Sequence, residues 1–438
     1  MALSERYDVI VVGAGSAGSS AAISAAREGA RTLLVDRLGF MGGTSTAVLD
    51  TFYAFYTPTE MPRRVVGGLG WEVVERLAAE GACFERPNTY GAGTGVTYDQ
   101  ETLKVVWERL ATDSGVELLL HTWATGVRLG DDRRVQAVRV WNKGGERWFA
   151  AGVIVDASGD ADVCALAGVG YEDMHTSGQV QSLSTLFRLA NVDVARARET
   201  PKAELWALMR AAAQAGEYRL PRLEGSWHAT PFEGVVMVHM TRIPRVDATD
   251  PVALTQAEIE GRRQVREYHR FLRDRVPGFE TSVVVGTSPS IGVRESRRVI
   301  GDYQLTRGDV LAGRRFDDEI ALCGAPIEDH GEGGGTEWRY VSDGGVYGLP
   351  YRSLLPAGVD GLLVAGRCFS ATHDAHASAR SMATCMAMGQ AAGMAAAMAV
   401  AAGVNPRAVN ADDLRARLRR ARVLLEPLPS PTALAPGA

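Results

Sequence analysis

The opening of the chain, residues 7–37, has the pattern of a complete βαβ unit. An apolar run of strand length leads directly into Gly13, Gly15 and Gly18, which have the spacing G-x-G-x-x-G. A helix of small residues should follow, and then a second apolar strand that ends at Asp36. A strand, a glycine-rich turn and a helix in this order predict a Rossmann-like α/β domain that binds a dinucleotide.

Each glycine has a physical role in that binding. Gly13 allows the strand to turn sharply, Gly15 lets the backbone approach a pyrophosphate, and Gly18 lets the helix pack closely on the strand. The first N–H groups of the helix then face the phosphates. Asp36 is placed to accept hydrogen bonds from a ribose and would repel a 2′-phosphate, so NADP is disfavoured. Arg37 beside it weakens that repulsion slightly.

The composition is that of an ordinary soluble protein of two or three domains, with 438 residues, 46% hydrophobic residues and a formal charge of −5. There is no basic block, so nucleic acid is not an expected partner. The five cysteines are scattered without a C-x-x-C, which argues against a disulfide framework, a zinc site and a dithiol centre. With no signal peptide before the first strand, a cytoplasmic location is expected.

One nearly uncharged stretch, residues 382–403, approaches the length of a membrane span. It is built from Ala, Met and Gly rather than from Leu, Ile and Phe. A buried helix is therefore predicted, and no membrane span.

Further helices, strands and loops are expected along the chain. A Gly-Gly-Thr loop at Gly42, Gly43 and Thr44 offers backbone amides and hydroxyls to phosphates or a cofactor ring. Amphipathic periodicity predicts helices over 70–81, 99–114, 203–215, 254–276 and 412–425. Apolar or alternating runs predict strands over 116–121, 125–129, 134–141, 146–150, 152–155, 235–241, 283–285 and 362–367. Glycine-rich loops are expected at 88–97 and 331–335, and a loop containing two histidines before the long helix.

Several blocks, taken in order, resemble the bacterial FAD-dependent oxidoreductase family of the glutathione-reductase-like superfamily, which has two dinucleotide-binding domains. The blocks are VIVVGAGSAGSSAAISAAREGARTLLVD, GFMGGTST, VIVDASGDADV, GVRESRRVIGDYQLT, YGLPYRSLLP and LLVAGRCFSATHDAHASARSMATCMAMGQAAG. The chain has no second G-x-G-x-x-G after a strand, so a built-in NAD(P) domain is not expected.

The resemblance implies FAD as cofactor and a contact for each of its parts. The ADP part would be held by Gly13, Gly15, Ser16, Ala17, Gly18, Asp36 and Arg37, and the pyrophosphate or flavin by Gly42, Gly43 and Thr44. Val127 would lie by the adenine, with Ala157 and Gly159 in the turn beneath it. Gly366 would be the glycine of a late Gly-Asp motif, in which this chain has Arg367 instead of Asp. A helix from about residue 387, with Gly389 and Gln390, would direct its N-terminus at flavin N1 and O2.

The resemblance also implies an α/β fold with a Rossmann-like FAD-binding domain, a β-meander and an inserted α+β substrate or cap domain. The predicted FAD-binding domain comprises residues 1–50, 99–169 and 353–425. The predicted cap comprises residues 51–98 and 170–352, and residues 426–438 are expected to be a disordered tail.

Catalytic candidates come from two stretches. His373 and His376 precede the flavin helix, and either is suited to accept a proton as hydride leaves the substrate, or both are structural. Arg294 and Arg297 would clamp a substrate carboxylate, or an ion-pair network there fixes the inserted domain. Tyr347 is expected to line the ring face. No metal is expected, because the one cluster of metal-ligand type lies on the histidine loop.

The predicted function is a FAD-dependent dehydrogenase or oxidase that removes a hydride from a small organic substrate. Its partners would be that substrate and an electron acceptor, which is oxygen, a quinone or a carrier protein. A homodimer is kept open as the assembly. The alternatives are a reductase or monooxygenase that uses diffusible NAD(P)H, and a non-redox flavin-binding module.

Overall fold

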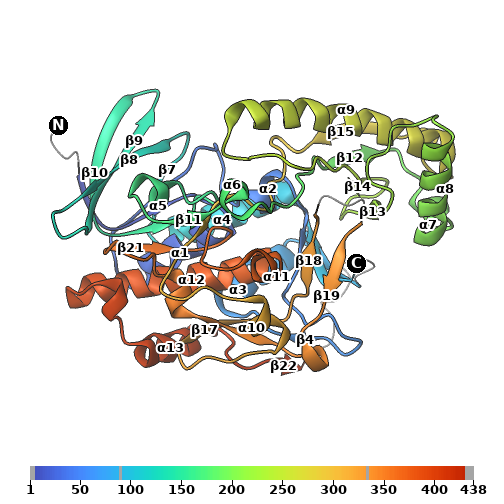
Figure 1. The fold of residues 1–438 in the computed structure, drawn as a ribbon. Helices are drawn as coiled ribbons and strands as arrows, with labels where there is room; N and C mark the ends of the chain where they lie inside the picture. The colour runs from blue at the N-terminus through green and yellow to red at the C-terminus, as the bar shows by residue number, and fades with distance from the viewer. Residues whose placement is uncertain (1–4, 88–90, 332–334, 430–438) are drawn as a thin grey trace.

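The computed structural model describes residues 5–87, 91–331 and 335–429 (Figure 1). The predictions for residues 88–90, 332–334 and 430–438 lie outside this part of the chain. At its centre is a seven-stranded sheet with the order β7-β2-β1-β10-β9-β8, in which β21 also pairs with β10. Its strands are β1 (Glu5–Val12), β2 (Thr32–Val35), β7 (Glu117–Leu119), β8 (Trp123–Leu129), β9 (Val135–Asn142), β10 (Gly145–Asp156) and β21 (Leu362–Val364).

Strand β10 joins the predicted meander to the parallel sheet. Its first half pairs antiparallel with β9, and from Phe149 onward it also pairs parallel with β1, which brings Asp156 opposite Val12. The sequence prediction of two strands, 146–150 and 152–155, is therefore wrong, because one strand of 12 residues spans both. A Cβ on Gly152 would lie 3.0 Å from the Val400 side chain, so this glycine marks the close approach of a helix rather than a strand end.

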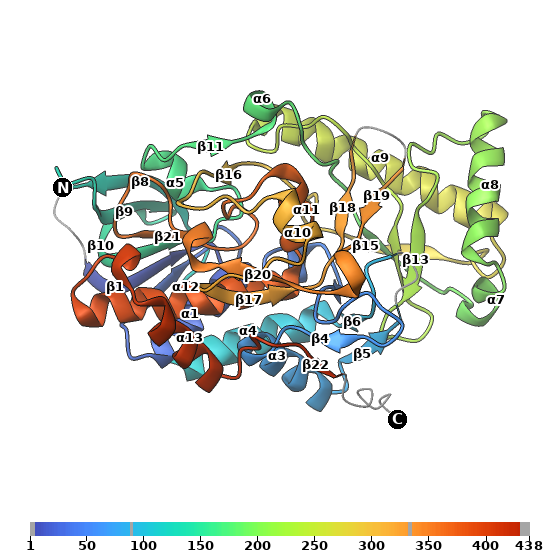
Figure 2. The ribbon, with the colours of Figure 1, turned by 60° about the horizontal axis from the view of Figure 1, so that its bottom comes forward.

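Two helices, α1 (Ser16–Arg27) and α12 (Met382–Ala402), run side by side along the sheet in Figures 1 and 2. A Cβ on Gly389 would lie 1.9 Å from the Ala17 carbonyl oxygen, and one on Gly393 would lie 2.0 Å from that of Ala21. The backbones therefore touch directly. Within the described residues, α12 has the length and hydropathy of a membrane span, but 78% of that window is buried inside the protein.

Other elements complete this part of the fold. The predicted helices over 70–81 and 99–114 are found as α3 (Gly68–Ala79) and α4 (Gln100–Asp113), and Asp99 caps the second by accepting two backbone N–H groups. The rest are α2 (Thr44–Ala47), α5 (Asp162–Leu166), α6 (Met174–Ser177), α10 (Arg307–Leu311), α13 (Ala411–Arg420), β3 (Thr51–Phe52), β4 (Arg63–Arg64), β5 (Cys83–Arg86), β6 (Gly95–Tyr98), β11 (Tyr171–Glu172), β16 (Arg298–Val299), β17 (Glu319–Cys323), β18 (Ile327–Asp329), β19 (Glu337–Arg339), β20 (Tyr347–Pro350) and β22 (Leu428–Pro429).

Two predictions near the C-terminal helix need correction. The histidine loop is a short helix, α11 (His373–Ala379), that begins directly after the buried segment of Ser370 and Ala371. The flavin helix begins at Met382 and not near residue 387, so Gly389 and Gln390 lie two turns inside it.

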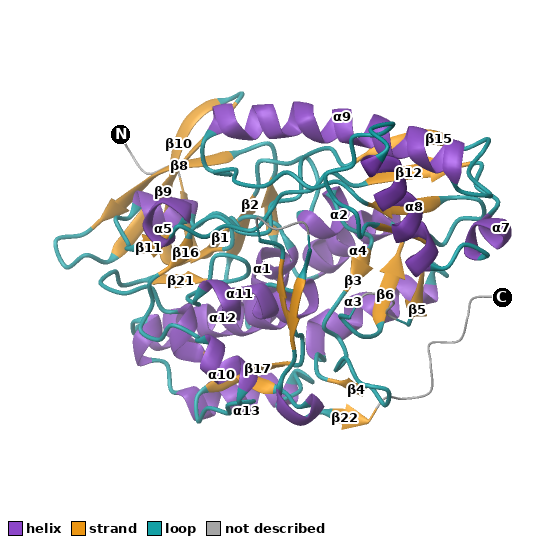
Figure 3. Ribbon diagram, turned by 45° about the vertical axis from the view of Figure 1, so that its right-hand side comes forward, coloured by secondary structure: helices purple, strands orange, loops and turns teal. Residues whose placement is uncertain are grey.

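A second sheet, with the order β13-β14-β12-β15, has a hydrophobic core of its own at one end of the molecule (Figures 1 and 3). Its elements are β12 (Phe187–Ala190), α7 (Val194–Arg198), α8 (Lys202–Gln214), β13 (Ser226–Ala229), β14 (Val236–His239), α9 (Pro251–Arg275) and β15 (Val283–Thr287). Phe187, Tyr268 and Phe279 are buried there. By contrast, Phe52, Leu77 and Ile320 belong to the larger core under the first sheet, so the proposed division into domains stays a prediction.

The contact between α1 and α12 generates a first prediction. In Gly389→Val, the new side chain would collide with the Ala17 backbone, and overpacking at a backbone contact costs about 3 kcal/mol or more of the free energy of unfolding. Urea unfolding measures this loss. Gly308→Ala is the matched control, because a Cβ there would meet nothing closer than 3.7 Å and should change stability by under about 0.5 kcal/mol. Equal effects of the two substitutions would contradict the described packing.

Candidate functional site

The glycine-rich turn adopts the geometry that the sequence predicts. Gly13 has a φ of +99°, and a Cβ on it would lie 2.3 Å from the Ala157 carbonyl oxygen. A Cβ on Gly18 would lie 1.7 Å from the Gly13 carbonyl oxygen, so Gly18 serves the close packing of helix on strand. A Cβ on Gly15 would meet no protein atom within 4 Å. The backbone at Gly15 is therefore open to a large group.

The Gly-Gly-Thr loop lies against this turn. Gly42 N–H donates to the Ala14 carbonyl at 2.7 Å, and a Cβ on Gly43 would lie 2.8 Å from Gly15 Cα. Gly43 and Thr44 then continue into α2. The loop and the first turn of α1 thus form two sides of one cradle, where backbone amides suit a pyrophosphate.

Asp36 closes the nucleotide end of the site. Its carboxylate accepts the backbone N–H of Ala14 at 2.5 Å and that of Leu38 at 2.6 Å. Burial raises the pKa of Asp36, while the two N–H groups act in the opposite direction. The carboxylate therefore fixes the turn that carries the cradle.

One continuous cavity runs from Asp36 past the cradle to the start of α12 and beyond, with about 1930 Å³ of free space, its open mouth included. The predicted residues that line it are Gly13, Gly15, Ser16, Ala17, Asp36, Arg37, Gly43, Thr44, Ala157, Gly159, Arg294, Gly366 and Arg367. Ser381, Met382 and Cys385 bring the N-terminal turn of α12 to the same cavity.

Five predicted cofactor residues do not line the cavity. Gly18 and Gly42 lie behind the cradle and support it, and Val127 packs against the core from β8. Gly389 is used in the contact with α1, as described above. Gln390 is occupied on the far side of α12, where its side-chain oxygen accepts the Leu69 N–H at 2.9 Å. Gly389 and Gln390 lie away from the cavity because α12 begins earlier than the start near residue 387 that the resemblance implies.

Arg367, which replaces the family's Asp, has its own acid. It pairs with Asp160 at 2.7 Å and donates to Ser296 Oγ at 2.9 Å. Asp160 also accepts from Ser296 Oγ at 2.7 Å. A guanidinium group paired with Asp160 therefore lines the cavity where a carboxylate was expected.

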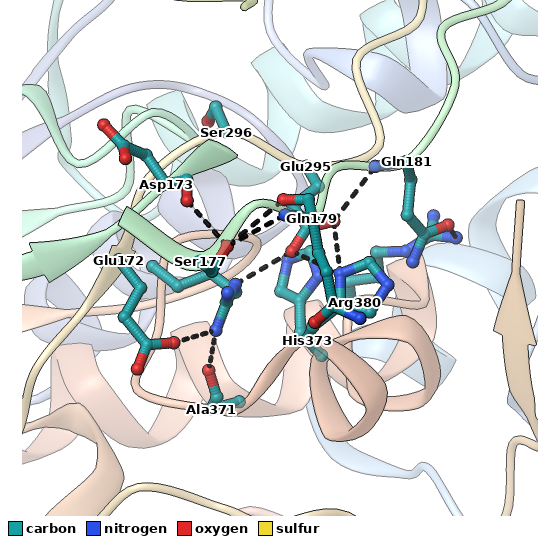
Figure 4. A network of polar contacts seen from close by, with 12 residues as sticks. Glu172, Asp173, Ser177, Gln179, Gln181, Glu295, Ser296, Ala371, His373 and Arg380 are labelled. Atoms are coloured by element: carbon teal, nitrogen blue, oxygen red, sulfur yellow. Dashed lines mark hydrogen bonds and ion pairs between the residues drawn. The ribbon is translucent and has the colours of Figure 1, made fainter. Parts of the chain in front are cut away.

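The two histidines of α11 are not in the cavity lining. His373 Nδ1 lies 2.9 Å from Glu295 Oε2 (Figure 4). Its Nε2 lies 3.4 Å from Asp329 Oδ1. Burial lowers the pKa of His373, but the hydrogen bonds to Asp329 and Glu295 outweigh it and raise the pKa to about 9. His373 is therefore a cation at neutral pH, and a cation is not suited to the role of proton acceptor that the sequence predicts for it.

The partner of His376 is a main-chain group. Its Nε2 lies 2.7 Å from the Arg367 carbonyl oxygen, so it donates there. Burial and the charge of Arg380 hold the pKa of His376 well below its usual range. The structural alternative thus describes the geometry of both histidines.

Arg297 and Tyr347 are also engaged elsewhere. Arg297 pairs with Asp162 at 3.1 Å and does not join Arg294 in a clamp. Tyr347 is fully buried, and its hydroxyl lies 2.6 Å from Ser378 Oγ. Neither residue lines the cavity.

The far end of the cavity carries charged and polar side chains that no sequence motif marked. Arg294 lies there as predicted, with five further residues: Arg222, His239, Glu328, His330 and Arg380. They come from four segments: the loop after α8, the end of β14, β18 with the residue that follows it, and the residue after α11. Only the assembled fold brings these segments together.

Contacts within this group orient its members. Arg294 donates to the Ser182 carbonyl at 2.6 Å and to Ser184 Oγ at 2.9 Å, and its Nη2 lies 3.2 Å from His239 Nε2. His330 Nε2 lies 2.9 Å from Glu328 Oε1. Burial and the charge of Arg294 lower the pKa of His330 to about 3, and burial with Arg222 holds the pKa of His239 well below its usual range.

The geometry defines an α/β dinucleotide-binding protein of the flavoenzyme class. A cradle of backbone amides, an acid at the second strand and a second helix N-terminus lie along one cavity, and these residues fit FAD. Residues 8–418 match the sequence model of the protein family described as FAD dependent oxidoreductase. The chain therefore belongs to that family, and its cofactor is FAD.

Comparison with individual proteins gives shorter or more distant matches. Over 52 residues the chain is 54% identical to the tRNA uridine 5-carboxymethylaminomethyl modification enzyme MnmG of Clostridium kluyveri, covering 10% of this chain and 8% of that protein. Over 187 residues it is 25% identical to a digeranylgeranylglycerophospholipid reductase of Methanosarcina mazei, covering 38% and 41%. The chain thus spans less than half the length of either curated relative. A crystal structure of a geranylgeranyl bacteriochlorophyll reductase-like protein from Thermoplasma acidophilum aligns at a TM-score of 0.47 and 14% identity, covering 95% and 82%.

The open backbone at Gly15 generates a prediction about the cofactor. In Gly15→Leu the side chain would occupy the space beside the cradle, and the affinity for FAD should fall by roughly 100-fold, the effect of losing about 3 kcal/mol of contacts. Quenching of FAD fluorescence on titration with the apoprotein measures the change. Far-ultraviolet circular dichroism should be unaltered, and unchanged FAD affinity in a folded variant would contradict this placement of the cofactor.

The ion pairs of His373 predict a pH dependence of stability. A pKa raised from 6.5 to about 9 stabilises the fold fully below pH 6.5, and this contribution is lost as pH rises through 9. Its full size is about 3 kcal/mol. Between pH 6 and pH 9.5 the free energy of unfolding should therefore fall more for the wild type than for His373→Gln. Parallel curves from urea unfolding would show that the carboxylates do not hold this proton.

Proposed function

We propose that this FAD-dependent oxidoreductase is a dehydrogenase or oxidase acting on a small organic substrate. The electrons would pass on to oxygen, a quinone or a carrier protein. The observation that supports it is the cavity, which continues past the nucleotide cradle and the start of α12 to a group of polar side chains. We place the substrate at that polar end, beyond the residues that would hold the nucleotide half of FAD.

Different residues along the cavity would bind different parts of the cofactor. The cradle residues Gly15, Gly43 and Thr44, with Asp36, would hold the nucleotide half of FAD. The positive end of the α12 dipole, at Ser381 and Met382, favours negative charge near its first turn. When bound, FAD supplies the ring that accepts a hydride equivalent.

A substrate proton must also be removed. His373 is unsuited to this, since its pKa is raised to about 9. His239 and His330 line the cavity as neutral imidazoles, but their lowered pKa values make them weak proton acceptors, and Arg294 already contacts His239 Nε2. We therefore assign these two histidines to holding the substrate and not to taking its proton. The carboxylate of Glu328, 2.9 Å from His330 Nε2, would hold the ring of His330 in one orientation.

A second candidate is the reductive direction, in which diffusible NAD(P)H reduces the flavin and the substrate is then saturated. The similarity to the archaeal digeranylgeranylglycerophospholipid reductase favours it. A monooxygenase would consume NAD(P)H in the same way and would also need oxygen.

The experiment is reduction of the holoenzyme under nitrogen. The protein is expected to be purified yellow, and the flavin absorbance near ~450 nm should bleach when the correct amino acid, hydroxy acid or sugar acid is added without NAD(P)H. Bleaching by NADPH or NADH alone would instead support the reductive candidate. A colourless protein that FAD does not reconstitute would overturn both.

A further inference from the structure

We infer that the polar end of the cavity is a binding site for a small dianion, a dicarboxylate, which Arg222, Arg294 and Arg380 hold. The inference rests on the proposed function, because it names the class of substrate at the same site. It differs from the sequence prediction, in which Arg294 and Arg297 form the clamp.

Guanidinium groups outnumber carboxylates in the described cavity lining at this end. Arg222, Arg294 and Arg380 line the cavity here, and Glu328 is the one acidic residue beside them in the described lining. Burial with Arg294 and with Arg222 lowers the pKa values of His330 and His239, so both imidazoles are neutral. The described lining thus presents three guanidinium groups and one carboxylate at this end, which favours an anion that can engage more than one guanidinium group.

The cations also repel one another. Burial lowers the pKa of Arg294, and the charges of Arg380 and Arg222 lower it further. Burial and Arg367 act in the same direction on Arg380, against the opposing charges of Glu328 and Glu295. A bound anion would relieve this repulsion, whereas a neutral substrate would leave it in place.

The positive potential extends beyond the lining. Lys202, at the start of α8, has its pKa lowered to about 8 by burial and by the charges of Arg86 and Arg222. A second group of cations thus lies next to Arg222. Such a field raises the local concentration of anions and speeds their entry.

Two of the guanidinium groups are already oriented. Arg294 is fixed by Ser182 and Ser184, as described above. Arg380 donates to Gln181 Oε1 at 2.9 Å, and its buried Nε has no hydrogen-bond partner among the described residues (Figure 4). A guanidinium that is held in place and still has a donor available is suited to a carboxylate.

The experiment measures anion binding to the FAD-loaded protein by the perturbation of the flavin absorbance spectrum. The probes are succinate, butyrate, 1,4-butanediol and inorganic phosphate. Succinate should bind at least about 10-fold more tightly than butyrate, and butanediol should not bind, because the extra carboxylate adds a charge-assisted contact. Equal affinities for succinate and butyrate, or binding of phosphate without succinate, would overturn the dicarboxylate assignment.

Variants test the residues. Arg294→Met should weaken succinate binding by roughly 10- to 100-fold, and Arg294→Lys by less, since Lys keeps the charge without the fork of donors. Arg109→Met is the matched control: Arg109 lies on α4, is largely exposed and pairs with Glu80. Unchanged succinate affinity in Arg294→Met overturns the site. If Arg294→Met does not retain FAD, the salt dependence of the wild type is the test instead. The affinity of the wild type for succinate should fall steeply as NaCl is added, and an affinity independent of salt would overturn the site.

The outcomes also separate this inference from the proposed function. If an uncharged substrate bleaches the flavin and succinate does not bind, the function stands and the dianion site fails. If succinate binds as expected and no donor bleaches the flavin, the dianion site stands and the oxidative function fails.

Discussion

The site depends on one contact, the direct packing of the α1 backbone against α12. Gly389 meets Ala17 and Gly393 meets Ala21, so the helices run in the same direction in a constant register. Ala17 is the second residue of α1, whereas Gly389 is the eighth of α12. At 1.5 Å per residue, the N-terminus of α12 therefore extends about 9 Å further along the axis than that of α1. This offset gives one cavity two helix N-termini, one at the cradle and one nearer the polar end.

A buried ionic network fixes the part of the chain that follows the central strands. The carboxylate of Glu295, which is 1% exposed, pairs with Arg298 at 2.8 Å and with His373 at 2.9 Å. It also accepts the backbone N–H of Gln181 at 3.1 Å (Figure 4). Arg298 in turn reaches Glu172 at 2.6 Å. Removing one partner of such a network would leave an uncompensated buried charge and would strongly destabilise the fold. Arg380 follows the same helix as His373, so the network also positions one cation of the polar end.

The nucleotide half could be predicted from the sequence because its determinants are local. Gly13, Gly15 and Asp36 act within one βαβ unit, and each role follows from backbone sterics and the helix dipole. The polar half could not, because its charges come from distant segments with no fixed spacing. His373 shows the difficulty: its position before the flavin helix suggested a base, but its partner Glu295 lies 78 residues away in sequence. The composition of residues 382–403 correctly predicted the buried helix α12, and only the start near residue 387 that the resemblance implied for the flavin helix was wrong.

The two acidic residues of the described cavity lining lie at opposite ends of the cavity, and each is engaged by different groups. Asp36 is engaged by backbone N–H groups at the nucleotide end, and Glu328 is engaged by His330 at the polar end. Burial raises the pKa of Glu328, but the hydrogen bond from His330 and the charges of Arg380 and Arg294 lower it, so the carboxylate stays ionised. A dicarboxylate bound as inferred above would meet the arginines away from Glu328. A fixed negative charge among cations would thus restrict its orientations, which cations alone would leave free.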